Sequence, residues 1–214
     1  MKPSLAVSTS QVKLWERLPD QETVDETIRA LNAHGFKAEL APDRRTALDK
    51  LRSLIPAGAE VMTGSSKTLE EIGLVNALAA GDQPWNNLKA QILAEKDREK
   101  QMRLRKLATF ADYFLGSVHA ITMKGQMVAG SASGSQLSAY AFGGKNLIIV
   151  AGTNKITRDL DEALLRLREH STPLEDQRMK SLGFPGTYLS KIFIYEGEKQ
   201  RNVHVILVNE KLGF

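Results

Sequence analysis

The stretch NLIIVAGTNKITRDLDEALLRLREH, residues 146–170, decides the fold. Asn146 to Ala151 is an almost uninterrupted apolar run and the strongest strand signal in the chain. A loop, Gly152-Thr153-Asn154-Lys155, follows it, and Asp159 then begins an amphipathic helix that we expect to reach His170. A buried strand followed by a loop and a helix is the repeating unit of parallel sheets. The stretch therefore predicts an α/β protein.

The same alternation extends over the rest of the chain. The expected strands upstream are 36–40, 60–62, 113–115 and 126–129. The expected helices are 11–33, one capped by Asp43, one begun at Thr68, a long amphipathic helix over 86–110, and 135–142. Downstream, a polar stretch after Pro173 leads to 191–195 and 203–208, which we interpret as a terminal strand pair. The pattern predicts a mainly parallel sheet covered on both faces, in a single domain over residues 1–214 with an N-terminal helical part of about 1–34.

Composition excludes several classes of protein. The chain of 214 residues has 42% apolar and 25% charged residues, the balance of a globular protein. No apolar run approaches the roughly 20 residues that span a bilayer, and the N-terminal sequence lacks the apolar core of a signal peptide, so we expect a cytoplasmic protein. Cysteine is absent, which excludes thiolate nucleophiles and cysteine-ligated clusters from this sequence. An iron–sulfur or flavin centre would therefore belong to a partner protein.

Charge gives little support to nucleic-acid binding. The net charge is only +4, and Lys and Arg are interspersed with Asp and Glu. The densest basic stretch, Lys96 to Lys106, carries opposite charges at helical spacing, which is typical of a solvated helix face. No group of His, Asp and Glu has the spacing of a metal site, so we expect no bound metal.

The most specific local feature is the turn Gly64-Ser65-Ser66, which leads from a strand into a helix. Gly64 lets the backbone approach a ligand, while Ser65, Ser66 and Thr68 place hydroxyls beside the unpaired amides of a helix start. This arrangement suits a phosphate or carboxylate. Glu71 is also a candidate ligand-binding residue. The alternative is an ordinary helix cap by Ser66 or Thr68, completed by Glu71 as a capping box. The turn has neither P-loop nor dinucleotide-binding spacing.

Three further loops follow predicted strands. Each is rich in small or polar residues; their candidate ligand-binding residues are Gly116, Ser117 and Thr122, then Ser131, Ser133, Gly134 and Ser135, then Gly152, Asn154 and Lys155. In the first of them His119 is a candidate acid or base, with a structural role about equally weighted. Because the carboxyl ends of parallel strands meet at one sheet edge, we expect all four loops to line one pocket for a small anion.

In these segments the chain resembles the LUD domain family, the lactate-utilisation proteins. The matching segments are GSSKTLEEIG (64–73), GSVHAIT (116–122), SASGSQL (131–137), AYAFGG (139–144), VAGTNKITRDLDEAL (150–164) and VHVILVNEKLGF (203–214). The resemblance implies a three-layer α/β/α fold similar to the sugar-phosphate isomerase and CoA-transferase-like group. It also implies a role in oxidation of L-lactate to pyruvate beside an iron–sulfur protein and a larger partner.

The sequence leaves two functions open. The chain is either an enzyme or enzyme component that binds a small carboxylate or phosphorylated ligand, or a non-catalytic binding and assembly subunit of an iron–sulfur redox complex. An isomerase-like or transferase-like activity ranks behind both, because a shared fold is only an analogy. A homo-oligomer is possible in each case.

Overall fold

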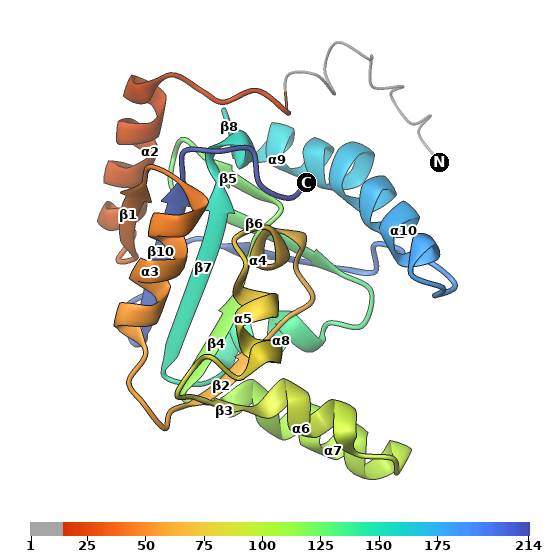
Figure 1. Cartoon of the computed structure of the whole chain (residues 1–214). Coiled ribbons are helices and arrows are strands. Elements are labelled where there is room, and N and C mark those ends of the chain that lie inside the picture. The colour runs from red at the N-terminus through yellow and green to blue at the C-terminus, as the bar shows by residue number, and fades with distance from the viewer. Residues whose placement is uncertain (1–14) are drawn as a thin grey trace.

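The computed structural model describes residues 15–214, which form a large parallel sheet, a smaller second sheet and surrounding helices (Figure 1). The large sheet has the order β1-β10-β7-β4-β2-β3, and every neighbouring pair in it is parallel. Its strands are β1 (Lys37–Ala41), β2 (Glu60–Thr63), β3 (Asn86–Asn87), β4 (Tyr113–Gly116), β7 (Asn146–Gly152) and β10 (Asn202–Val208). The mainly parallel sheet predicted from the sequence is confirmed.

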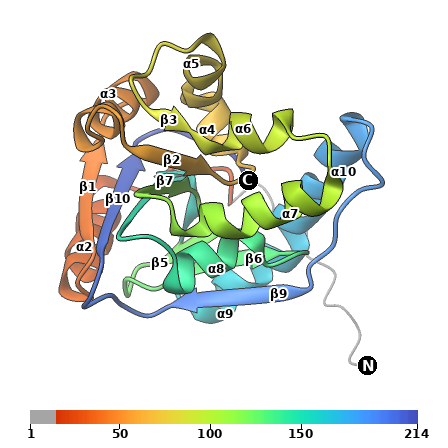
Figure 2. The same ribbon diagram turned by 90° about the horizontal axis from the view of Figure 1, so that it is seen from below.

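The second sheet was not predicted. It has the order β8-β5-β6-β9, formed by β5 (Ala120–Thr122), β6 (Met127–Ser131), β8 (Ile156–Thr157) and β9 (Lys191–Tyr195). β6 runs antiparallel to both β5 and β9, whereas β8 runs parallel to β5. Figure 2 shows this sheet on the side of the large sheet that faces away from α3 and α5.

Helices cover both faces of the large sheet. On one face α3 (Arg44–Leu54), α4 (Lys67–Glu71) and α5 (Leu74–Ala80) pack against the side chains of Ile148 and Val150. On the other face α2 (Gln21–Ala33), α8 (Ser135–Phe142) and the second sheet pack against Leu147 and Ile149. Neighbouring residues of β7 thus serve opposite cores, as the alternation of side chains along a strand requires. The three-layer α/β/α arrangement is confirmed.

The second sheet has its own outer cover. Ala120 and Val128 pack against Ala163 of α9 (Leu160–Arg166) and Leu167, the first residue of a π-helical turn over Leu167–Ser171. α10 (Thr172–Ser181) follows directly, with Pro173 in its first turn. The prediction of a helix ending at His170 is therefore wrong: proline is tolerated in a first helical turn, where its missing N–H is not needed.

Two other predicted helices also differ. The first helix of the described residues, α2, begins at Gln21, because Asp20 caps it by accepting from the backbone N–H of Thr23 at 2.8 Å. Residues 11–14 of the predicted helix lie outside the described range. The long helix over 86–110 is instead β3, α6 (Leu88–Ala94), α7 (Arg98–Leu107) and a 3-10 turn (Ala108–Phe110), because Asp97 caps a new helix. α6 and α7 project from one end of the large sheet in Figure 1.

The predicted terminal strand pair is wrong. β9 pairs with β6 in the second sheet, and β10 lies between β1 and β7 in the large sheet. Most side chains of β10 are buried, and Val205 to Val208 form an unbroken buried run, which is typical of a central strand covered on both faces. Within residues 15–214, no helix is both long enough and apolar enough to cross a bilayer.

Candidate functional site

A cavity of about 460 Å³ lies beyond the carboxyl ends of β2 and β4. Parts of three predicted loops line it, Gly64–Thr68, Ser117–His119 and Gly130–Ser133 with Ser135, together with Lys155 from the fourth. α6, α7 and α10 contribute further side chains, and the closing residues Gly213 and Phe214 line it as well. The cavity thus brings together loops that are far apart in the sequence.

The β2–α4 turn uses its polar groups within the protein. The Gly64 N–H continues the ladder by donating to the carbonyl of Leu115 at 3.1 Å, and a Cβ at Gly64 would lie 2.6 Å from Oε1 of Gln136. The close approach at Gly64 in this structure is thus to the flexible end of a side chain of α8, and Gly64 also lines the cavity. Ser66 caps α4, since its Oγ accepts from the N–H of Leu69 at 3.3 Å.

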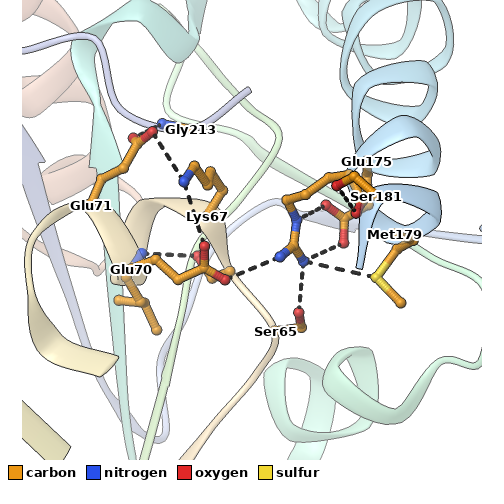
Figure 3. Close-up of polar contacts among 11 residues, drawn as sticks. Ser65, Lys67, Glu70, Glu71, Glu175, Met179, Ser181 and Gly213 are labelled. Atoms are coloured by element: carbon orange, nitrogen blue, oxygen red, sulfur yellow. Dashed lines mark hydrogen bonds and ion pairs between the residues drawn. The ribbon is translucent and has the colours of Figure 1, made fainter. Parts of the chain in front are cut away.

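Glu71 does not form the predicted capping box and does not line the cavity. Its Oε2 accepts from the backbone N–H of Gly213 at 2.7 Å, which fixes the closing segment beside α4 (Figure 3). Gly152 and Asn154 also lie against the closing segment. Asn154 Oδ1 accepts from the N–H of Leu212 at 3.1 Å, and a Cβ at Gly152 would lie 2.7 Å from that nitrogen. All three of these candidates therefore position the wall of the cavity.

The loop after β4 places a hydroxyl at the base of the cavity. Gly116 leaves room for Tyr140, because a Cβ there would lie 2.0 Å from the phenolic oxygen, and that hydroxyl donates to the carbonyl of Ser117 at 2.7 Å. Ser117 Oγ lies 3.3 Å from Oγ1 of Thr68. Thr122 lies away from the cavity, where its Oγ1 accepts from the N–H of Gln126 in the β5–β6 turn.

Lys155 is buried, with 2% of its surface exposed. Its Nζ donates to Oγ1 of Thr68 at 2.9 Å, to Oγ of Ser117 at 3.1 Å and to the carbonyl of Val118 at 3.0 Å. Burial lowers the pKa of Lys155 to about 7, and the positive charge of Arg166 adds to the effect. The sequence interpretation put Lys155 at the rim, whereas it lies beneath the hydroxyls that line the cavity.

His119 lines the cavity as a neutral ring. Its Nδ1 accepts from the backbone N–H of Gly130 at 3.1 Å, so the ring proton belongs on Nε2. Burial lowers the pKa of His119 to about 3, with further lowering by Lys155 and Arg166. Arg166 is fully buried behind the loop and donates to the His119 carbonyl. The ring can therefore donate a hydrogen bond but is poorly suited to accept a proton.

The loop between β6 and α8 carries three serines that line the cavity, Ser131, Ser133 and Ser135. Ser131 Oγ accepts from the N–H of Gly134, which has a φ of 83° and begins α8 without lining the cavity itself. Glycine adopts this left-handed conformation without strain. Ser135 Oγ accepts from Arg105 of α7 at 2.8 Å.

Sequence reasoning missed the cations that helices supply. Lys89 of α6 lines the cavity and donates to the carbonyl of Gly64 at 3.3 Å, and burial lowers its pKa. Arg105 lies in the stretch interpreted as a solvated helix face, and α7 indeed buries no residue, yet this side chain lies at the cavity. Within residues 15–214 neither Lys89 nor Arg105 forms an ion pair. No motif in the sequence marks either residue.

Arg178 of α10 ties the β2–α4 turn to α10 beside the cavity. It contacts Glu70 at 3.1 Å, the Oγ of Ser65 at 3.0 Å and both carboxylate oxygens of Glu175. Figure 3 shows Ser65 and Glu70 on one side of this network and Glu175 on the other. Glu175 is the only acidic side chain that lines the cavity within the described residues, and it is already paired with Arg178.

The lining is therefore cationic overall. Lys67, Lys89 and Arg105 outnumber the single, paired acidic side chain, although Lys67 lies 3.6 Å from Glu70. A cationic concave surface attracts anions and stabilises them. The described residues contain no group of three or more His, Asp or Glu side chains that could bind a metal ion.

Comparison with known proteins agrees with this fold. The LUD domain model matches residues 24–208. The chain is similar to a DUF162 family protein from Deinococcus radiodurans, whose crystal structure gives a TM-score of 0.50 at 14% identity over 90% of this chain and 100% of that one. A weaker likeness, with a TM-score of 0.36 at 16% identity, is to eIF2B delta from Chaetomium thermophilum over 67% of this chain and 56% of that one. No curated protein matches the sequence.

Proposed function

Because the chain belongs to the LUD domain family, a family associated with lactate utilisation, we propose that its cavity binds a small carboxylate or phosphorylated metabolite. The observation that carries this function is the positive charge of Lys89 and Arg105, neither of which forms an ion pair within residues 15–214, at a cavity whose one described acidic side chain, Glu175, is already paired. Charge-assisted hydrogen bonds from such groups are the strongest that a protein offers an anion.

His119 adds a neutral hydrogen-bond donor to the lining of the cavity. Its Nε2 carries the ring proton, so it can donate to a carboxylate or carbonyl oxygen of the ligand without competing for a proton. Lys155 contributes less directly, because its three hydrogen bonds already go to Thr68, Ser117 and Val118. The ligand's negative group therefore belongs near Lys89 and Arg105.

Oxidation of a hydroxy acid needs an electron acceptor, which side chains alone do not provide. We therefore assign the redox centre, iron–sulfur or flavin, to a partner protein, and assign ligand binding to this chain. The role that follows is a component of L-lactate oxidation or of related carboxylate metabolism.

Isothermal titration calorimetry tests this function directly. L-lactate, pyruvate, inorganic phosphate and ribose 5-phosphate are each titrated into the full chain at low salt, because screening weakens exposed ion pairs. We expect saturable heat with at least one anion and a loss of affinity as salt is added. An absence of heat across all four compounds, with protein shown to be folded, refutes the proposed function.

A further inference from the structure

The hydrogen bonds around Lys155 are unusual because none of them goes to a carboxylate. Its Nζ meets two hydroxyls, those of Thr68 and Ser117, and the carbonyl of Val118. Within residues 15–214 Lys155 forms no ion pair, and a buried ammonium without a counter-ion is costly. The neutral amine is therefore readily formed, as a pKa of about 7 also indicates.

The neutral amine of Lys155 can make only a small set of hydrogen bonds. It has two N–H groups and one lone pair, and the carbonyl of Val118 can only accept, so it takes one N–H. One hydroxyl can accept the second N–H, which leaves the lone pair able to accept the proton of the other hydroxyl; Ser117 Oγ also lies 3.3 Å from Oγ1 of Thr68 and 3.4 Å from the carbonyl of Val118. Either Ser117 or Thr68 is then hydrogen-bonded to a base, the arrangement that activates a hydroxyl nucleophile.

Accessibility favours Ser117 as that hydroxyl. Both side chains line the cavity, but Ser117 is 7% exposed and Thr68 only 1%. Ser117 also carries an unbranched primary hydroxyl, whereas the methyl group of Thr68 hinders approach. Thr68 is thus suited to hold Lys155 in place.

The same loop supplies a donor for developing negative charge. His119 follows Ser117 by two residues, lines the same cavity and carries its ring proton on Nε2. A neutral imidazole N–H can stabilise the oxyanion that forms when a hydroxyl attacks a carbonyl. The nucleophile, the base and the oxyanion donor therefore all line the same cavity.

We propose that Ser117 is a nucleophile, with Lys155 as its base, and that the chain hydrolyses an ester or thioester of a small acyl group. Ser117 Oγ forms a bond to the acyl carbonyl carbon as its proton passes to Lys155 Nζ. Lys155 then returns the proton to the departing alcohol or thiol, leaving an acyl ester on Ser117. Water then attacks that ester as Lys155 takes one of its protons, and Lys155 gives this proton to the departing Ser117 Oγ, which releases the acid and restores free Ser117 and the neutral amine.

This activity is distinct from anion binding, because an ester can react at Ser117 without being bound as an anion. A fluorophosphonate probe, which labels activated serines, tests it on the full chain by intact mass and peptide mapping. We expect a single adduct on Ser117, its loss in Ser117→Ala, and normal labelling in Ser53→Ala, which alters an exposed serine on α3. The rate of p-nitrophenyl acetate hydrolysis should decrease as the labelled fraction of the protein increases.

Lys155 is tested by Lys155→Met, which should slow labelling at least about 100-fold, the usual contribution of a base. If that variant does not fold, the pH profile of the wild type replaces it, and labelling should rise through a midpoint near pH 7. The charged groups near Lys155 are Arg166 and Glu71, while His119 remains neutral over this range. Absence of an adduct from folded protein, an adduct on another residue, or a pH-independent rate overturns the proposal. Calorimetry with phosphate on the same sample keeps this failure distinct from failure of anion binding.

Discussion

The backbone N–H of Gly130 donates to Nδ1 of His119 at 3.1 Å, which couples β6 to the loop after β4. An amide N–H cannot accept, so this contact holds the ring as the neutral tautomer with its proton on Nε2. Protonation of Nδ1 would break the bond and place a charge beside Lys155 and Arg166. From the sequence, an acid or base and a structural role were about equally weighted at this position, whereas the geometry favours a fixed donor.

The first prediction concerns the protonation of His119. Because its pKa is lowered to about 3, the ring should stay neutral from pH 8 down to pH 5. Two-bond nitrogen–proton NMR spectra should show the Nε2-protonated tautomer throughout, with His119→Gln used to assign the signal. A titration of this ring near pH 6 would contradict the prediction.

The second prediction concerns stability and pH. The pKa of Lys155 is lowered to about 7 in the folded chain, below its ordinary value of 10.5, so between these values the unfolded chain binds the extra proton. Stability should therefore rise with pH, by up to about 1.4 kcal/mol per pH unit. Urea unfolding from pH 7 to pH 9 measures this slope.

Lys155→Met is the matched control for that slope, because it keeps a long side chain without a titrating group. The variant should lose most of the rise in stability, while the other titrating groups stay the same. Equal slopes in the wild type and the variant would show that another group dominates in this pH range.

The third prediction concerns anion binding. Lys89→Met and Arg105→Met should each weaken phosphate binding roughly 10-fold or more, the usual cost of one charged hydrogen bond. Arg103→Met removes the same charge from the exposed part of α7 and lies outside the cavity lining, so it should leave affinity almost unchanged. Calorimetry at one fixed salt concentration makes the comparison. Equal losses in all three variants would mean a non-specific charge effect.

How much of the site could be predicted depends on where each residue lies in the chain. Ser117 and Lys155 follow strands, and strand ends of a parallel sheet converge, so their proximity could be inferred from the order of elements. Lys89 and Arg105 come from helices with no recognisable motif, and only packing turns them toward the cavity. Sequence patterns therefore predicted the base of the site better than its rim.

The errors in the fold have a similar origin. Val203 to Val208 was correctly expected as a strand, but pairing between β1 and β7 is a long-range relationship that local periodicity does not contain. The break between α6 and α7 did have a local signal, since Asp97 accepts from the N–H groups of Glu99 and Lys100. The continuous run of helical periodicity concealed that cap.

The last prediction compares two glycines of the site. A Cβ at Gly116 would lie 2.0 Å from the hydroxyl of Tyr140, a buried side chain that cannot move without losing its bond to Ser117. Gly116→Ala should therefore destabilise the chain by about 1–3 kcal/mol, as overpacking usually does. A Cβ at Gly64 would meet only the flexible end of Gln136, at 2.6 Å, so Gly64→Ala should cost less.

Urea unfolding of both variants measures the difference, and a second substitution identifies its cause. Tyr140→Phe removes the clashing oxygen, so Gly116→Ala should cost less in that background than in the wild type. The coupling is measured by a double-mutant cycle, which isolates the contact between the two residues. If the destabilisations caused by Gly116→Ala and Tyr140→Phe are simply additive, contact with the Tyr140 hydroxyl is not the reason that β4 ends in glycine.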